Sequence, residues 1–327
     1  MIHPSTAPAS ATRRFPWLRL LAGALLAGFL LFLLGREIAW ADVLRFLGQA
    51  QVGWLLLGVA AIFINSLARA QRWRLLFPRE QAPPSLPQAL GILLAGQLIN
   101  NLLPLRGGDI SRALLAGRRR GASTITAAAT IGAEKLIDVS AAALLVAIVV
   151  PYFVLPAWLE TNLAGVYTTI ALAVLIWAAL IFALPAAERY LAAWTTSGRP
   201  LAALAVRVHN LLRGLRALRQ RRRLPQLLFW SLGVWGFSIA ATWCVLAAFD
   251  LTASALAAAL VVIIIQGGIS VPVAPGHIGV FEWLAVLALR TLGFGDDVAL
   301  AFALVLHAIV LLPPVLVGLP WLWRATR

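Results

Sequence analysis

Long apolar segments separated by short basic intervals run through the whole chain. A segment of roughly 17 or more apolar residues predicts a membrane-spanning helix. Arginines concentrate in cytoplasmic loops, so the basic intervals indicate the direction of each crossing. On these two criteria we predict an all-α polytopic membrane protein with six full spans, at residues 18–35, 52–68, 123–150, 163–184, 226–248 and 298–320.

Two further apolar segments, residues 86–112 and 254–292, are interrupted by polar residues, prolines and glycines. Arginines flank the first segment on both sides, and a full crossing would place one of these clusters outside the cell. We therefore predict a re-entrant helical hairpin that enters and leaves from the cytoplasm. The second segment is predicted to enter from the opposite side. Irregular backbone at membrane depth must line a cavity walled by protein or water.

The turns of both hairpins are predicted at residues that break helices or permit unusual backbone angles. They are Pro104, Gly107 and Gly108 in the first hairpin, and Pro272, Pro275, Gly276 and Gly279 in the second.

The order of elements is similar in the two halves of the chain. After a cytoplasmic tail at residues 1–17, we predict a first membrane repeat at 18–162 and a second at 163–327. Each contains a span, a surface segment, a span, a hairpin and a span. The surface segments are a short helix at 36–51 and a basic amphipathic stretch at 186–225. Opposite orientations make this an inverted-topology repeat, whose interrupted helices indicate a transporter binding site.

Composition agrees with a membrane protein and excludes several other classes. Of 327 residues, 61% are hydrophobic and 12% charged, and the mean hydropathy is +0.90. The net charge of +15 lies between apolar segments, which fits anionic lipid head groups better than nucleic acid. The single cysteine, Cys244, excludes an internal disulfide and a cysteine metal site. No P-loop, metalloprotease or nucleophile-elbow motif is present, so we expect neither a cofactor nor a metal.

The first hairpin carries the strongest candidate for a ligand site. Arg106 would bind a lipid phosphate through its planar guanidinium group, with Asp109 holding it or meeting a cationic head group. Alternatively, Asp109 caps a helix and the arginines only set topology. We predict a substrate-binding role for the polar residues of this hairpin, which are Asn100, Asn101, Arg106, Asp109 and Arg112.

Three charged residues, Glu134, Lys135 and Asp138, follow in the next predicted span. Glu134 and Asp138 share one helix face, and charges inside a spanning helix are costly. Two roles are equally supported: contact with a ligand or proton, or neutralisation of Arg106 and Arg112 to fix the hairpin.

In the second hairpin, Glu282 follows the predicted turn. A carboxylate in the first turn of a helix is stabilising in any protein, but its depth in the membrane favours a role in substrate binding. His277 is in the turn itself. His307 is expected to pack in the core, although it follows Glu282 by the same 25 residues that separate Asp109 from Glu134.

Three ordered motifs resemble the lysylphosphatidylglycerol synthase transmembrane-region family, the flippase-like membrane portion of the multiple peptide resistance factor. They are Asn101-x-x-Pro104-x-Arg106-x-Gly108-Asp109-x-x-Arg112, then Glu134-Lys135-x-x-Asp138, then Pro272-x-x-Pro275-Gly276-x-Ile278-Gly279-x-x-Glu282. His277 stands where this family often has a second glycine. The resemblance covers roughly residues 20–322.

The resemblance implies a bacterial inner-membrane protein with both termini in the cytoplasm that moves a phospholipid, such as aminoacyl-phosphatidylglycerol, between leaflets. The soluble aminoacyl-transferase domain of fused relatives has no counterpart here, so we expect a transporter rather than an enzyme. Two alternatives are a non-catalytic membrane partner of a lipid or glycolipid synthase and a membrane-embedded lipid-modifying transferase. The expected partners are membrane phospholipids, with a lipid synthase and a second copy of the chain as further candidates.

Overall fold

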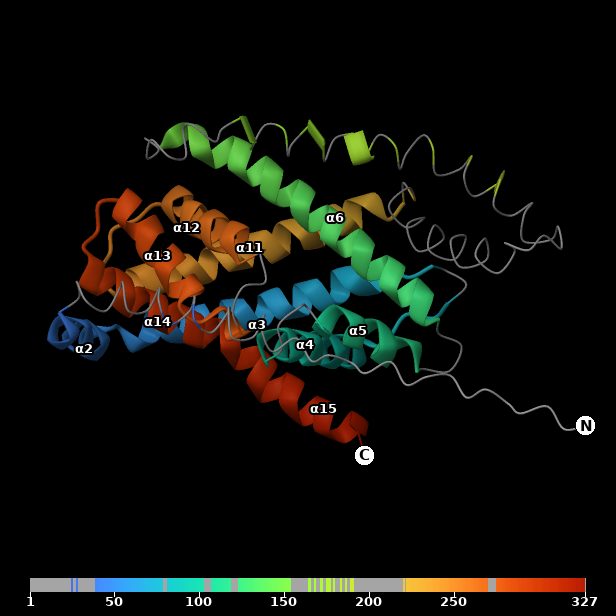
Figure 1. Cartoon of the computed structure of the whole chain (residues 1–327), viewed down its shortest axis with the longest axis horizontal. Coiled ribbons are helices and arrows are strands. Elements are labelled where there is room, and N and C mark those ends of the chain that lie inside the picture. Colours follow the sequence, from blue (N-terminus) through green and yellow to red (C-terminus); the bar gives the residue numbers. More distant parts are fainter. Residues whose placement is uncertain are drawn as a thin grey trace, which may run out of the picture.

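The computed structural model describes residues 39–78, 81–102, 107–118, 123–153, 222–269 and 275–326, together with residues 25, 28 and 220 and isolated positions between 164 and 190. Every regular element within this part of the chain is a helix (Figure 1). The predicted tail 1–17 lies outside the described residues, and so do most of the spans 18–35 and 163–184 and most of the amphipathic segment 186–225.

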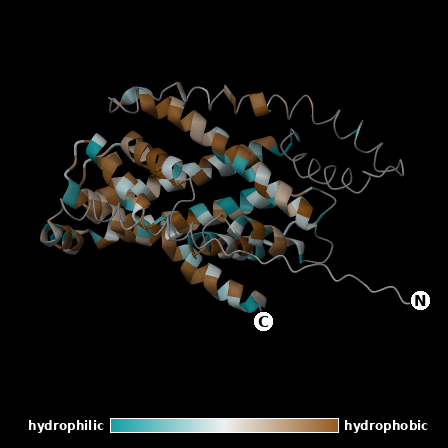
Figure 2. Cartoon of the chain, viewed as in Figure 1, coloured by the Kyte–Doolittle hydropathy of each residue, from teal (hydrophilic) through white to brown (hydrophobic). Residues whose placement is uncertain are grey.

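The described helices are mostly apolar along their length (Figure 2). Among the described residues, three helical segments are long and apolar enough to cross a membrane, at Val52–Leu75, Leu224–Ala248 and Asp296–Ala325. The chain is therefore an all-helical, multi-pass membrane protein. In order, the α-helices are α2 (Trp40–Gln49), α3 (Val52–Leu75), α4 (Leu86–Leu102), α5 (Gly107–Gly117), α6 (Thr124–Val149), α11 (Leu224–Ala248), α12 (Ala255–Gly268), α13 (Val280–Thr291), α14 (Asp296–Pro313) and α15 (Leu319–Thr326).

Most predicted boundaries agree with these helices. Helices α6 and α11 begin and end within two residues of the predicted segments 123–150 and 226–248. The predicted end of the second span at residue 68 is wrong, because α3 continues to Leu75. A π-helical turn, η4 (Pro314–Gly318), joins α14 to α15 where Pro313 and Pro314 interrupt the α-helical hydrogen bonds.

Helices α3 and α11 form a central antiparallel pair. At one end the Gln51 side chain donates a hydrogen bond to the Asp250 carboxylate at 2.6 Å. At the other end Arg223 donates to the Leu75 carbonyl oxygen at 2.7 Å. Between them the buried Asn65 amide donates to a backbone carbonyl of α11 at 2.5 Å. These polar contacts, made at both ends and in the middle, fix the register of two mostly apolar helices.

Helices α4 and α5 form the first helical hairpin. The Gly108 amide donates to the Asn100 side-chain oxygen at 2.8 Å. A Cβ atom at Gly108 would collide with the Gly96 carbonyl oxygen and with Asn100, so the close approach of the two helices requires glycine there. The hairpin predicted at 86–112 extends to Gly117.

Helices α12 and α13 form the second hairpin, within the predicted limits 254–292. Its turn contains the short 3₁₀ helix η3 (Pro275–His277). Gly276 and Gly279 have φ angles of +64° and +81°, which explains the predicted glycines. His277 has a φ of +57°, a conformation that glycine adopts at lower cost than histidine.

The turn of the second hairpin lies against α4, near its C-terminal end. Helix η3 packs against α4, and a Cβ at Gly276 would lie 3.6 Å from the Asn101 carbonyl oxygen. The hairpins also pack into different parts of the core. One apolar cluster joins α2, α3, α11, α12, α13 and α14, and another joins α3, α4, α5, α6 and the start of α11. Helices α3 and α11 belong to both clusters, so this central pair connects the two hairpins.

The predicted surface helix at 36–51 is present as α2. Its Val43 side chain is buried, and Phe46 and Leu47 pack against the cluster that contains α14. The Ala39 amide also donates to the Asp297 carboxylate at 3.0 Å. Much of the apolar face that we expected to meet lipid therefore meets protein, whereas Leu44 remains exposed.

Candidate functional site

A group of seven charged side chains lies where α3, α5 and α6 meet. We call it the charge cluster. Its members are Arg69 and Arg72 from α3, Asp109 and Arg112 from α5, and Glu134, Lys135 and Asp138 from α6.

The centre of the charge cluster is a buried ion pair. Arg112 donates to the Glu134 carboxylate at 2.6 Å, and these side chains are 3% and 0% exposed. The Arg112 guanidinium also stacks over the Trp73 ring at 4.8 Å from its centroid, and the Trp73 indole donates to Thr130. Aromatic stacking and ion pairing together fix this guanidinium plane, which joins α5 to α3 and α6.

A second strong pair joins α3 to α6. Arg72, which is fully buried, donates to Asp138 at 2.6 Å. The Arg72 and Arg69 guanidinium groups also lie 3.8 and 3.7 Å from the other oxygen of Glu134. One carboxylate therefore faces three guanidinium groups, so Glu134 neutralises charge that would otherwise be costly to bury.

The outer members of the charge cluster are more accessible. The Asp109 carboxylate lies 3.4 Å from the Lys135 ammonium and 3.7 Å from the Arg112 guanidinium. Asp109 is 21% exposed, Lys135 43% and Asp138 26%. Glu134 and Arg112 therefore serve as a buried structural centre, and the partly exposed side chains are the ones within reach of a ligand.

The charge cluster has four cationic and three acidic members, which leaves one formal positive charge. The Nε atoms of Arg69, Arg72 and Arg112 are buried and have no hydrogen-bond acceptor among the described residues. Positive charge and spare donors at this depth favour an anionic ligand group over a cationic one.

Five of the residues predicted from the sequence meet in this cluster: Asp109, Arg112, Glu134, Lys135 and Asp138. Asn100 instead joins the ends of the first hairpin through its bond to Gly108, and the Asn101 carbonyl lies beside the second turn. Pro104, Arg106 and Pro272 lie outside the described residues.

Arg69 and Arg72 also belong to the charge cluster but were not among the residues predicted from the sequence. Both follow residue 68, the predicted end of the second span, in a basic interval that indicates only the direction of the crossing. Their spacing of three residues places them on one helix face, and only the continuation of α3 to Leu75 brings that face to α6. The three-residue spacing of Arg69 and Arg72 would have predicted an ion-pair role only if α3 had been predicted to continue past residue 68.

Glu282 lies apart from the charge cluster. One of its oxygens accepts a hydrogen bond from the Gly279 amide at 2.6 Å, and the other lies 2.6 Å from Nδ1 of His307. The His307 ring stacks on Phe281, with centroids 4.3 Å apart. These contacts fit the stabilising first-turn carboxylate, and a ligand role for Glu282 stays a prediction. Glu282 and His307, which are 25 residues apart, contact each other directly. Asp109 and Glu134 have the same separation, but each pairs with Arg112.

An apolar groove of about 740 Å³ lies between α6 and α11. One of its lining residues, Ser231, accepts a long hydrogen bond of 3.5 Å from Arg72, so the wall of the groove contacts the charge cluster. We call it the apolar groove. It is lined by Ile137, Ser140, Ala141, Leu144, Leu145, Ile148, Trp177, Leu224, Pro225, Leu227, Leu228, Ser231, Leu232 and Trp235.

A family model described as the lysylphosphatidylglycerol synthase TM region matches residues 19–318. The chain belongs to this family. Membership in the lysylphosphatidylglycerol synthase TM-region family agrees with the helical fold and relates the chain to the membrane part of a lipid-metabolising system. Searches of curated proteins and of solved structures found no match. No group of histidine, cysteine and acidic residues suited to a metal ion occurs within the described ranges.

Proposed function

We propose that this protein is a lipid translocase that moves a phospholipid between the leaflets of the bacterial inner membrane. The observation that carries the proposal is the contact between the buried charge cluster and the apolar groove through Arg72 and Ser231. A phospholipid has a charged head group and apolar chains, and this arrangement offers a place for each. Protein charges would replace part of the head group's hydration, which lowers the cost of crossing hydrocarbon.

The proposed topology is an inverted repeat with six spans and two re-entrant hairpins. The antiparallel pairing of α3 with α11 supports it, because these helices occupy corresponding places in the two halves. Contact between η3 of the second hairpin and α4 of the first supports it too, because inverted repeats place their interrupted segments at a common site. Both termini are placed in the cytoplasm by the positive-inside rule. Rocking one repeat against the other would expose the site to each leaflet in turn.

The substrate class follows from the charge cluster. Arg69 and Lys135, which are partly exposed, would attract the phosphate. Asp109 and Asp138 would interact with a cationic group on the same head group, as in an aminoacylated phosphatidylglycerol. Glu134 and Arg112 would keep α5 and α6 together while the outer pairs exchange partners.

Translocation of a head-group-labelled phospholipid in proteoliposomes tests this function. We expect Asp138→Asn and Arg72→Gln to slow translocation about tenfold, because each removes a hydrogen bond between charged groups. Asp42→Asn is the matched control, since it breaks an exposed pair with Arg45 on α2. Size-exclusion profiles of each variant would verify folding.

Four results would separate the alternatives. If wild type and all variants move lipid equally, transport does not depend on the charge cluster and the proposed site is wrong. If none moves lipid, the translocase proposal is wrong and a partner of a lipid synthase is favoured. If the labelled lipid is recovered chemically altered, a lipid-modifying enzyme is favoured. A selective loss in the charge-cluster variants supports transport through this site.

A further inference from the structure

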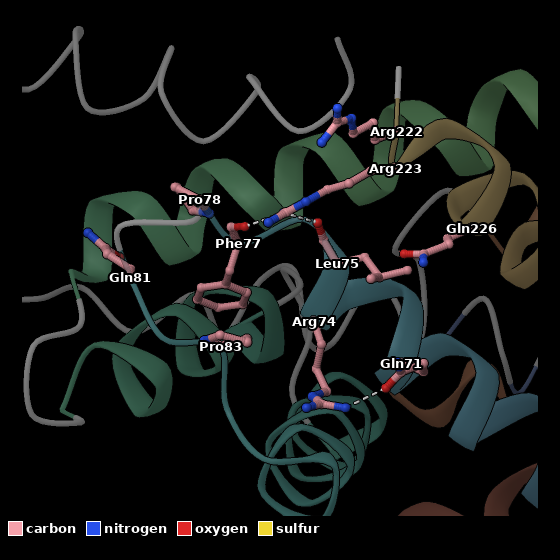
Figure 3. Close-up of a pocket in the computed structure, with 10 residues that line it drawn as sticks. All are labelled: Gln71, Arg74, Leu75, Phe77, Pro78, Gln81, Pro83, Arg222, Arg223 and Gln226. Atoms are coloured by element: carbon pink, nitrogen blue, oxygen red, sulfur yellow. Dashed lines mark hydrogen bonds between the residues drawn. The ribbon is translucent and has the colours of Figure 1, made fainter. Parts of the chain in front are cut away.

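The first turn of α11 separates the apolar groove from a second hollow of opposite character. This hollow, which we call the basic pocket, has a volume of about 500 Å³ (Figure 3). It lies where the end of α3 and the following loop meet the start of α11. Its lining residues are Gln71, Arg74, Leu75, Phe77, Pro78, Gln81, Pro83, Arg222, Arg223 and Gln226.

Backbone carbonyl groups hold two arginines of the basic pocket in place. The Arg223 guanidinium donates to the Leu75 and Phe77 carbonyl oxygens at 2.7 and 2.6 Å, as Figure 3 shows. Arg74 donates to the Pro84 carbonyl at 2.8 Å and to the Gln71 side chain. These acceptors are neutral, so the hydrogen bonds orient both guanidinium groups and do not cancel the charge of Arg74.

The pocket has a positive potential from more than one source. Arg222, exposed, adds a third guanidinium group, and the lining residues of the pocket as described include no aspartate or glutamate. The N-terminus of α11 lies at the same place and has no side-chain cap from Arg223. Helix N-termini and arginine forks both favour phosphate groups.

The opposite side of the same helical turn is apolar. Leu224, Pro225, Leu227 and Leu228 line the apolar groove, whereas Arg222, Arg223 and Gln226 line the basic pocket. Within two turns, α11 thus presents a phosphate-binding surface to one hollow and a hydrocarbon-binding surface to the other. A ligand that occupies both must be amphipathic.

We propose that the basic pocket and the apolar groove together bind one anionic phospholipid, with its phosphate against the arginines and an acyl chain in the groove. The binding of this lipid does not depend on the proposed function. Its role as the loading site for transport rests on the proposed function. The arginine-rich end of α3 and α11 belongs to the cytoplasmic leaflet by the positive-inside rule, where anionic lipids are enriched. The apolar groove would then lead from this site to Ser231 and the charge cluster.

Native mass spectrometry of the full chain in detergent, titrated with phosphatidylglycerol or phosphatidylcholine, tests the site. Arg222→Gln removes one exposed charge and Gln226→Glu adds an opposing one, and neither position is buried. We expect each to weaken phosphatidylglycerol binding about fivefold and to change phosphatidylcholine binding much less. Arg45→Gln, on α2, is the control for charge alone and should leave both affinities unchanged.

Two further measurements distinguish binding of a lipid from binding of a soluble phosphate. Leu228→Trp, at an exposed position of the apolar groove, should weaken binding of both lipids by filling space for the chain. Inorganic phosphate should compete poorly with phosphatidylglycerol. If phosphate alone binds with the same dependence on Arg222 and Leu228→Trp has no effect, the pocket is an anion site and the lipid proposal is wrong. Unchanged phosphatidylglycerol affinity in Arg222→Gln and Gln226→Glu also overturns it.

Binding and translocation measured on one variant set distinguish this proposal from the proposed function. Asp138→Asn tests the charge cluster through translocation, and Arg222→Gln tests the basic pocket through binding of phosphatidylglycerol. If the basic-pocket variants lose binding while no protein translocates lipid, the site stands and the translocase function fails. If charge-cluster variants lose translocation while the basic-pocket variants bind normally, the function stands and this site fails.

Discussion

Replacing Glu134 with glutamine tests whether the charge cluster is held together by one buried carboxylate. Glutamine keeps the shape of the side chain and one oxygen acceptor, so the cavity term is negligible and the change is almost purely in charge. Arg112 would lose its charged partner at 2.6 Å, and two more guanidinium groups would lose their nearest shared negative charge. The side chain is fully buried, so water cannot replace the missing charge.

Removing one member of a buried ion pair costs roughly 3–5 kcal/mol, because the remaining charge stays desolvated. Glu134→Gln should therefore lower the thermal denaturation temperature of the purified protein markedly. The double variant Glu134→Gln with Arg112→Gln removes both charges and should recover part of the loss, since an uncharged pair can still hydrogen bond. A thermal unfolding series in one detergent, read by intrinsic tryptophan fluorescence, measures all four members of this cycle.

Asp42→Asn serves as the control, because it breaks an ion pair in which both side chains are well exposed. Such pairs contribute little to stability, so the denaturation temperature should not change. The reasoning is refuted if Glu134→Gln and Asp42→Asn are equally stable. It is also refuted if the double variant loses more stability than the two single variants lose together, since Glu134 would then not be acting through Arg112.

Three further predictions address the hairpins. Gly108→Ala should destabilise the fold by roughly 1–3 kcal/mol by forcing α4 and α5 apart, while Gly107→Ala, which has room for a Cβ, should be tolerated; equal effects would contradict the packing. Glu282→Gln should cost about 1.5–3 kcal/mol through loss of charged hydrogen bonds at the start of α13, and a neutral result in thermal unfolding would remove its anchoring role. In a Cys244→Ala background, single cysteines at Gly107 and Ile278 should react with a membrane-impermeant thiol reagent from the cytoplasm and from outside respectively; labelling of both from one side would exclude the inverted hairpins.

The helices were readable from the sequence because hydrophobicity and helix breakers act locally. Runs of leucine, alanine and valine bounded by Pro151, Asp250 or the arginines predicted α6 and α11 to within two residues. The turn glycines were readable for a similar reason, since only glycine adopts the φ angles at Gly276 and Gly279 without strain. Local chemistry therefore carries most of the secondary structure of a membrane protein.

Partners across helices were much less readable. Arg72 lies in a basic stretch whose composition is explained equally well by topology, and nothing local distinguishes it from Arg74 beside it. One donates to Asp138 inside the protein, and the other donates to the Pro84 carbonyl at the edge of the basic pocket. The difference depends on where α3 ends and which helices pack on each face, which are properties of the tertiary structure.

The two hollows illustrate the same limit. Arg223 and Leu224 are neighbours in the chain and line different hollows, because α11 turns about 100° per residue and packs against different partners on each side. The sequence predicts a basic, amphipathic region here but not the surfaces that face it, since residues 71–83 come from α3 and its following loop.

Burying three charged side chains, Arg72, Arg112 and Glu134, in an apolar fold is not an efficient route to stability. Well-packed apolar residues at Arg112 and Glu134 would be expected to serve as well or better. The chain instead keeps a pair with almost no exposure and surrounds it with Asp109, Lys135 and Asp138, which are partly open. A buried centre alone would fix the helices, and an open rim alone would be too loosely held to position a head group. In the proposed site, the outer side chains can exchange partners while the buried Arg112–Glu134 pair keeps α3, α5 and α6 in register. A head group bound by the outer side chains would then lie close to Arg72, which contacts the wall of the apolar groove.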